Sequence, residues 1–134
     1  MLHQDTHRDT SCVYVSQLAA GFEFAEAERI IQAAHRRNAE HGIRGALVFD
    51  GERFAQLLVG PPAAVAALMG RIVLDVRHNM IQRLYDGPTA LVGDVRRWSS
   101  GYCGRADLDA VADSGGGEPA VRALLNLIDS AVMF

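Results

Sequence analysis

Hydrophobic and polar positions change their period several times along the chain, and each change marks an expected element. Residues 11–17 alternate as a strand does, with Tyr14 on one face and Val13 on the other. Residues 24–41 instead repeat apolar positions at helical spacing and stop before Gly42, a residue suited to the left-handed end of a helix. The first two expected elements are therefore a strand and a helix.

A hairpin is expected next. Residues 45–49 and 53–59 both fit strands, and the Asp-Gly pair between them is typical of a tight β-turn. In the second of these strands, alternation places Gln56 on the same face as Phe54 and Leu58. The turn fixes which residues pair across the hairpin.

The remaining pattern completes a ferredoxin-like sheet with an added strand. Gly-Pro-Pro at 60–62 opens a second helix that we expect to reach about Asp75, and extended segments follow at 80–86 and about 89–102. The expected order is β-α-β-β-α-β-β, an α/β (α+β) fold with both helices on one face. We also expect the first and third strands to be parallel neighbours at the centre of the sheet.

The far face of the sheet needs a cover, because its predicted side chains are too apolar for water. A glycine run at 115–117 precedes residues 118–132, which repeat apolar positions at helical spacing and are the expected cover. The chain then divides into a flexible lead (1–10), a main domain (11–102) and a helical extension packing on the sheet (103–134). The far-face residues are Val13, Val15, Ala55, Leu57 and Val59, and the helix positions are Val121, Leu124, Leu125, Ile128 and Val132.

Two primary amides are predicted to point into the core. Asn38 falls inside the apolar stripe of the first helix, and Gln56 lies on the inner face of its strand, beside Tyr14. A buried amide needs hydrogen-bond partners, which the backbone commonly supplies. Two such amides together also invite a polar ligand. The stripe consists of Ala27, Ile30, Ile31, Ala34 and His41.

Composition and charge narrow the function classes. With 134 residues, 49% apolar, 22% charged and a net charge of −3, the chain fits one globular domain without a general attraction to nucleic acid or anionic membrane. No apolar run approaches a membrane span and the first ten residues do not resemble a signal peptide, so we expect a cytoplasmic protein. Cys12 and Cys103 lack metal or redox spacing, which favours small core residues.

A set of short motifs stands in order along residues 11–102. The motifs are Tyr14-Val15-Ser16, Asn38, Gly42-Ile43-Arg44-Gly45, Phe54-Ala55-Gln56, Gly60-Pro61, Asp75-Val76-Arg77-His78 and Trp98-Ser99-Ser100-Gly101-Tyr102. Each motif is weak alone, but the ordered set is specific. Together they resemble the BLUF domains, blue-light sensors that use flavin, in their short, single-domain, bacterial form.

The resemblance implies a flavin ring held between the two helices. Asn38 and Arg77 would bond the polar edge of the ring, and Tyr14 and Gln56 would be the photoactive pair. The implied cofactor is FAD, with FMN or riboflavin as alternatives. The implied cofactor-binding residues are Ser16, Asn38, Phe54, Gln56, Arg77 and His78, and the implied signal-output residues are Trp98 and Ser100.

Four positions depart from the pattern of the family. Arg44 replaces a usual threonine, Phe49 a common tyrosine, Val59 a glutamate and Ser100 a methionine. None of these changes removes an implied flavin contact. The change at Ser100 exchanges a soft apolar side chain for a small hydroxyl, and so bears on signal output.

The residue types suit this chemistry on physical grounds. A phenol such as Tyr14 can give up an electron and then a proton, and rotation or tautomerisation of the Gln56 amide changes which end faces its neighbours. The fixed donor fork of Arg77 suits a ring carbonyl. Each of these residues, taken alone, also has a purely structural interpretation. Tyr14 and Trp98 would be packed core residues, Arg77 would be a surface residue, and His78 would be a histidine at the end of a helix.

Three function classes compete for this sequence. The first is a blue-light photoreceptor that signals to a separate partner in trans, expected because the chain carries no output enzyme domain, and that forms a homo-oligomer. The second is a flavin-free, light-insensitive interaction module of the same fold. The third is an enzyme, either a flavin redox catalyst or an acylphosphatase-like hydrolase, but the Gly21 loop lacks a phosphate-cradling arginine and no catalytic motif appears. We favour the first class and do not expect an enzyme.

Overall fold

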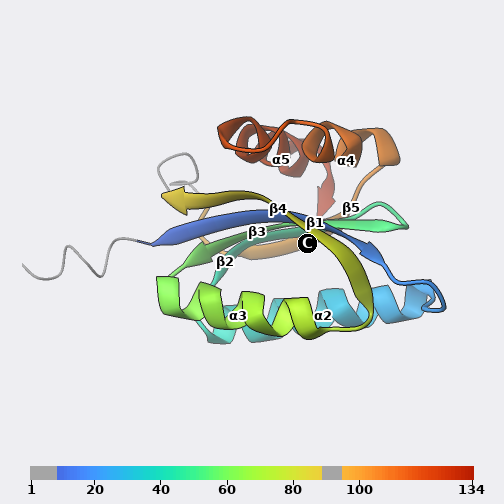
Figure 1. Cartoon of the computed structure of the whole chain (residues 1–134), viewed down its shortest axis with the longest axis horizontal. Coiled ribbons are helices and arrows are strands. Elements are labelled where there is room, and N and C mark those ends of the chain that lie inside the picture. Colours follow the sequence, from blue (N-terminus) through green and yellow to red (C-terminus); the bar gives the residue numbers. More distant parts are fainter. Residues whose placement is uncertain (1–8, 89–94) are drawn as a thin grey trace, which may run out of the picture.

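A computed structural model describes residues 9–88 and 95–134 as a six-stranded sheet between two pairs of helices (Figure 1). The strand order is β4-β1-β3-β2-β5-β6. No helix within these two ranges is long and apolar enough to cross a membrane. The elements are β1 (Thr10–Leu18), α2 (Phe24–Glu40), β2 (Arg44–Phe49), β3 (Arg53–Gly60), α3 (Pro62–Leu74), β4 (His78–Pro88), β5 (Trp98–Tyr102), α4 (Arg105–Ala112), α5 (Glu118–Ser130) and β6 (Val132–Met133).

The predicted order of strands and helices is confirmed through β5, with element ends within a few residues of the expected ones. Two elements were not predicted, the short helix α4 and the two-residue strand β6. The C-terminal helix ends at Ser130 rather than Val132, and Val132 is exposed in β6. Residues 1–8 of the expected lead and 89–94 of the expected extended segment lie outside the described residues.

The pairing of β1 with β3 is antiparallel, and our expectation of parallel neighbours was wrong. The connection through α2 brings β2 back in the direction of β1. The tight turn after β2 then reverses the chain, so β3 runs against both strands. Tyr14 lies directly opposite Gln56 in this register, so the two side chains point to the same face of the sheet.

The sheet has a packed core on each face. Tyr14, Leu58 and Trp98 belong to the cluster under α2 and α3, whereas Val13 and Leu57 belong to the cluster under α4 and α5. Figure 1 shows the two helix pairs on opposite sides of the sheet. The expected cover by the C-terminal helix is therefore confirmed, with α4 as a second part of it.

Local sequence signals explain the ends of the central elements. Asp50 accepts hydrogen bonds from the backbone N–H groups of Glu52 and Arg53 (2.9 and 2.6 Å), which closes the hairpin turn. Helix α2 ends before Gly42, whose φ of 71° is left-handed. His41, which we placed in the buried stripe, is instead an exposed residue at the end of the helix, because the chain turns away there toward β2.

We predict that Gly45→Ala destabilises the fold by about 2–4 kcal/mol. Gly45 has a φ of 138°, and a Cβ atom there would collide with the Leu57 carbonyl oxygen on β3. Gly70→Ala is the control, because this exposed helical glycine has open space around it and should gain about 0.5–1 kcal/mol. Urea unfolding measures both. Equal midpoints for the two variants would contradict the steric argument.

Candidate functional site

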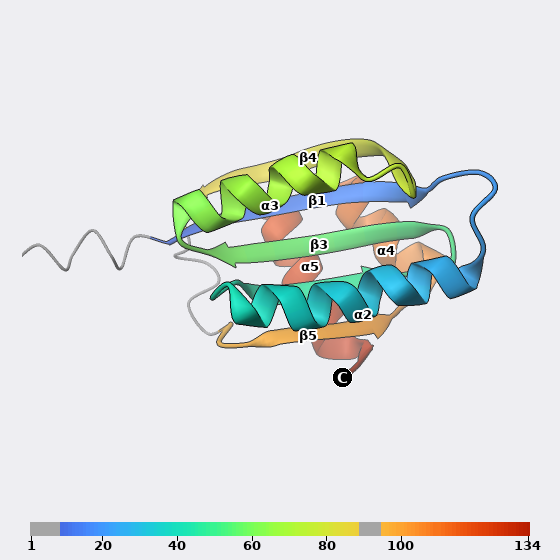
Figure 2. The same ribbon diagram turned by 90° about the horizontal axis from the view of Figure 1, so that it is seen from below.

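A cleft opens between α2 and α3 above the centre of the sheet. About 500 Å³ of space free of protein atoms lies in and above it, open solvent included. Figure 2 shows β3 running between the two helices, and Gln56 on this strand is among the lining residues. The cleft is therefore walled by two helices and floored by the sheet.

The α2 wall of the cleft follows from helical spacing. Ile30, Ala34 and Asn38 line it at intervals of four residues, which places them on one side of the helix. Leu68 and Ile72 repeat the same interval on α3. Two apolar walls that face each other across a narrow cleft suit a flat, apolar ring.

The floor carries the pair that the sequence singled out. Tyr14 is 2% exposed and Gln56 is 4% exposed, and both line the cleft. Burial raises the pKa of Tyr14 well above its ordinary value, and Cys12 and Asp75 raise it further, so the phenol keeps its proton. Among the described residues, the buried Gln56 Oε1 has no hydrogen-bond partner. An acceptor buried without a donor costs about 1–3 kcal/mol, so this atom points to a partner that the chain itself does not provide in this arrangement.

His78 is fixed by two hydrogen bonds within the protein. Its Nε2 lies 2.8 Å from the Ile72 carbonyl oxygen and must donate to it, so in the neutral ring Nδ1 accepts from the Ser16 hydroxyl at 2.9 Å. Both ring nitrogens are therefore in use. The His78 ring lines the cleft, with its centroid 6.2 Å from that of Phe54, whereas Ser16 is not among the lining residues and contacts the ring of His78.

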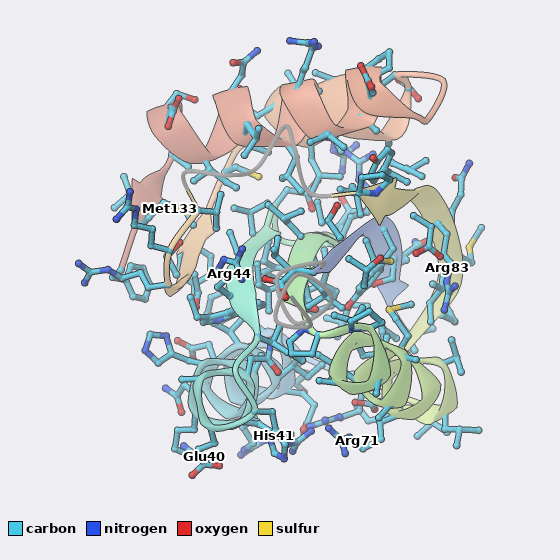
Figure 3. All side chains as sticks on the ribbon, turned by 90° about the vertical axis from the view of Figure 1, so that its left-hand side faces the viewer. Glu40, His41, Arg44, Arg71, Arg83 and Met133 are labelled. Atoms are coloured by element: carbon cyan, nitrogen blue, oxygen red, sulfur yellow. The ribbon has the colours of Figure 1, made fainter. Side chains whose placement is uncertain are left out.

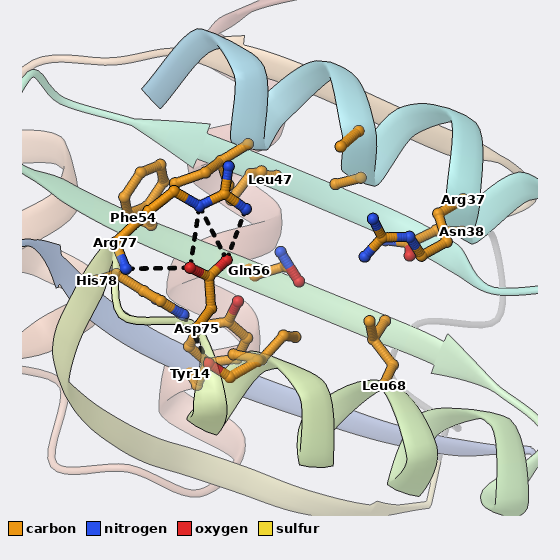
Figure 4. Close-up of a pocket in the computed structure, with 14 residues that line it drawn as sticks. Tyr14, Arg37, Asn38, Leu47, Phe54, Gln56, Leu68, Asp75, Arg77 and His78 are labelled. Carbon is orange, nitrogen blue, oxygen red and sulfur yellow. Dashed lines mark hydrogen bonds and ion pairs between the residues drawn. The ribbon is translucent and has the colours of Figure 1, made fainter. Parts of the chain in front are cut away.

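Arg77 bridges two walls of the cleft through carboxylates. Its Nε and Nη2 donate to Asp75 at 2.9 and 2.7 Å, and its Nη1 donates to Glu26 on α2 at 3.0 Å. Figure 4 shows the fork between Arg77 and Asp75 at one end of the cleft. One N–H remains free of these bonds on each terminal nitrogen, and these are the donors available to a ligand. We call this Glu26–Arg77–Asp75 group the carboxylate clasp.

The ion pairs of the carboxylate clasp shift the pKa values of all three of its side chains. Hydrogen bonding to Arg77 is the main cause that lowers the pKa of both Glu26 and Asp75. The two carboxylates in turn raise the pKa of Arg77 beyond its already high value. All three groups are therefore charged at neutral pH, and the clasp carries one net negative charge.

The opposite end of the cleft holds Asn38 and Arg37. Asn38 is 2% exposed and its backbone carbonyl accepts from Ile43 N–H, which ties α2 to the start of β2. Arg37 is exposed on the helix surface, and Figure 4 shows it beside Asn38. The cleft thus has a negative end at the clasp and a positive end at Arg37.

The two expected output residues lie outside the cleft lining. Trp98 is 6% exposed and packs in the helix-side cluster, with its buried Nε1 unpartnered among the described residues. Ser100 pairs with Leu47, and Leu47 pairs with Gln56, so one strand separates Ser100 from the amide. A direct hydrogen bond between Ser100 and Gln56 would therefore have to reach across Leu47.

The sequence reasoning missed several residues of the cleft lining and of the carboxylate clasp. Asp75 belongs to one of the motifs named above but was given no role there, and Arg37 is adjacent to Asn38. The sequence therefore contained a clue to both residues. Glu26 had none, because it lies 51 residues from Arg77 in the chain and meets it only through the packing of α2 beside the α3–β4 turn. From the sequence, Leu47 could be identified only as a residue of the predicted strand 45–49.

Comparisons with known proteins agree with this arrangement. The family profile described as "BLUF: Sensors of blue-light using FAD" matches residues 10–100. The chain is 33% identical over 78 residues to the blue light- and temperature-regulated antirepressor BluF of Escherichia coli, covering 58% of this chain and 19% of that protein. It is 34% identical over 79 residues to the photoactivated adenylate cyclase subunit beta of Euglena gracilis, covering 59% of this chain and 9% of that protein. The chain thus spans a fifth or less of these curated relatives.

A solved structure matches over nearly the whole chain. The dark-state structure of BlrB, a BLUF protein, aligns with a TM-score of 0.72 and 28% sequence identity. The match covers 92% of this chain and 96% of BlrB. The similarity therefore extends past residue 100, where the family profile ends.

We predict that the carboxylate clasp contributes stability that acid removes. Arg77 holds the pKa of Glu26 and Asp75 below their ordinary values of 4.5 and 3.8, so this contribution is complete above those values and is lost as the pH falls through the lowered ones. Wild type should lose more free energy of unfolding between about pH 6 and about pH 3 than a Glu26→Gln/Asp75→Asn variant. Urea unfolding at each pH is the measurement.

The matched control is Asp86→Asn/Glu118→Gln, which removes two carboxylates from solvent-exposed ion pairs. Its response to acid should equal that of wild type, because exposed pairs contribute little. An identical acid response in all three proteins would show that the clasp adds nothing to the fold.

Proposed function

The chain belongs to the family of blue-light sensors using FAD, and from this premise we propose that it is a photoreceptor that switches through Tyr14 and Gln56. The observation that carries the proposal is the buried, unpartnered Gln56 Oε1 beside a protonated phenol at the floor of an open cleft. A chain that only needed a stable core would place an apolar side chain there.

The cleft residues fit a flavin. The apolar walls from α2 and α3 suit the ring system, and the free N–H groups of Arg77 and the amide of Asn38 suit its carbonyl and imide edge. Phe54 and His78 add flat contact surface next to Tyr14. Arg37 at the positive end supports a phosphate-bearing flavin, FAD or FMN, because its cationic fork suits phosphate.

The switching chemistry belongs to the photoactive pair. A flavin held in the cleft would supply the absorption of blue light and an acceptor for one electron. Tyr14 would supply that electron and then its hydroxyl proton, both to the flavin, since a phenol that has lost an electron becomes a strong acid. With the proton moved, the hydrogen bonds around Gln56 favour the other orientation or tautomer of its amide, and return of the electron and proton to Tyr14 leaves the new pattern in place.

The signal leaves along the sheet toward β5 and acts on a separate protein. Gln56, Leu47 and Ser100 stand opposite one another on three adjacent strands, so a shift at the amide is felt at β5 through Leu47. Two relatives by name combine light sensing with an antirepressor and with an adenylate cyclase, which supports an output by protein contact.

We predict that purified protein carries a flavin spectrum that shifts slightly and reversibly to the red in blue light, with no net flavin reduction. Gln56→Leu removes the amide while roughly keeping volume, and Tyr14→Phe removes the transferable proton. Both variants should stay yellow and lose the shift. Absorption spectra in darkness and after illumination are the measurement.

Gln82→Leu and Tyr85→Phe are the matched controls, because Gln82 is exposed and the Tyr85 hydroxyl bonds, among the described residues, to the Pro88 carbonyl oxygen alone. Both should shift like wild type. Colourless protein after refolding with excess flavin would favour the flavin-free interaction module, and an undiminished shift in Gln56→Leu would refute the switching mechanism.

We predict that illumination changes amide exchange in Arg97–Tyr102 and in the cover helix α5. Trp98→Phe should alter this response without loss of flavin, and Ser100→Met should strengthen or redirect it, because methionine fills more of the space next to Leu47. Hydrogen exchange followed by mass spectrometry measures both segments. Identical exchange in darkness and light, with the spectrum still shifting, would place the output elsewhere.

A further inference from the structure

The outer edge of β5 is covered by the last residues of the sequence. Gly101 pairs with Met133 and Tyr102 with Val132 in an antiparallel ladder. Ser100 and Phe134 extend the ladder by exchanging two backbone hydrogen bonds of 2.8 and 2.7 Å. We call residues 132–134 the tail strand.

The tail strand is held mainly by its backbone. Val132 is 75% exposed and Phe134 is 64% exposed, although both are large apolar side chains. Only Met133 is partly buried against the core under α4 and α5. A segment that buries so little apolar surface gains little from the hydrophobic effect, so its hold on β5 is weak and exchangeable.

Gly101 shapes β5 for a close neighbour strand. Its backbone does not require a positive φ, so conformation alone does not explain the glycine. A Cβ atom there would collide with the Val132 carbonyl oxygen and lie 2.6 Å from the Met133 sulfur. The missing side chain is what lets another backbone approach this edge.

The two edges of the sheet differ in their readiness to pair. Figure 3 shows Arg83 at one edge and Met133 at the other. The β4 edge carries the charged, exposed pair Arg83–Asp86, irregular register against β1 and a positive φ at Met80, all features that oppose strand addition. The β5 edge, Trp98–Tyr102, has no charged residue.

An aromatic surface adjoins the β5 edge. The Tyr102 ring lies 5.9 Å from Phe24, nearly parallel to it, and 6.0 Å from Phe134. Phe24 is 51% exposed. This surface offers a place for an aromatic or apolar side chain of a neighbouring strand, as Phe134 demonstrates.

We propose that the β5 edge is a docking site for an extended, apolar segment of a partner protein, which adds antiparallel to β5 in place of the tail strand. The occupant would repeat the contacts of the tail strand. Its backbone would form hydrogen bonds with the backbone of Ser100, one of its residues would lie opposite Gly101, and one of its side chains would pack on the Tyr102 ring. The docking site goes beyond the proposed function and does not require flavin. It lies on the same sheet as the cleft, because Tyr14, Gln56, Leu47 and Ser100 are successive partners across adjacent strands.

The test uses the full chain in darkness and a fluorescein-labelled peptide with the sequence of residues 129–134, DSAVMF, followed by fluorescence anisotropy. Phe134→Pro removes the N–H that bonds to Ser100, so the internal competitor weakens and the peptide should bind about fivefold more tightly than to wild type. Gly101→Ala should abolish binding, because its Cβ excludes any strand from this edge.

Peptides methylated on one backbone nitrogen give a matched pair that leaves the protein unchanged. In the antiparallel ladder, the N–H of the Phe134 position faces β5, and that of the Met133 position faces away. Methylation at the Phe position should remove binding to the Phe134→Pro chain, whereas methylation at the Met position should preserve it.

Three results would overturn the proposal. The first is equal peptide binding to wild type and Phe134→Pro, or no binding to either. The second is that the two methylated peptides lose binding to the Phe134→Pro chain to the same extent, or that neither of them loses it. The third is a dimer of the wild-type chain in sedimentation that Gly101→Ala abolishes, because the occupant of the edge is then a second copy of this chain. All three measurements are made without light, so failure of the photoreceptor proposal does not affect them.

Discussion

The antiparallel pairing of β1 with β3 is the constraint on which the site depends. It places Tyr14 opposite Gln56 on the helix side, and a slip of one residue would turn Tyr14 into the far core and Val13 into the cleft. Such a slip is strongly disfavoured because both faces are packed with apolar side chains. The same register continues through Leu47 to Ser100, so one pattern of strand pairing aligns the floor of the cleft with β5.

The carboxylate clasp sets the electrostatics of the cleft. Arg77 is held by acids from two elements, so its orientation is fixed, while part of its donor fork remains available. The clasp keeps a net negative charge and Arg37 supplies a positive one at the far end, so the two ends of the cleft differ in the sign of their charge. The same ion pairs also tie α2 to the turn before β4, which limits how far the cleft can open.

The cover on the far face gives the sheet a second packed core, opposite the cleft. The match to BlrB spans 92% of the chain, whereas the matches to the curated relatives span 58% and 59%. The helices on the far face pack on the same strands that floor the cleft. A change on one side of the sheet therefore has only one layer of backbone to cross before it reaches the other.

Periodicity along the chain was enough to predict most of the elements and the faces on which their residues lie. Alternation placed Tyr14 and Gln56 on one face, and the ordered motifs indicated the family, because local spacing sets which side chains point the same way. Tertiary structure alone decided the antiparallel direction of β1 and β3, the meeting of Glu26 with Arg77, the exposure of His41 and the pairing of Phe134 with Ser100. These features join residues far apart in the chain or depend on how one element leaves another. No local period encodes them, since they arise only when the packed elements bring distant backbone and charge together.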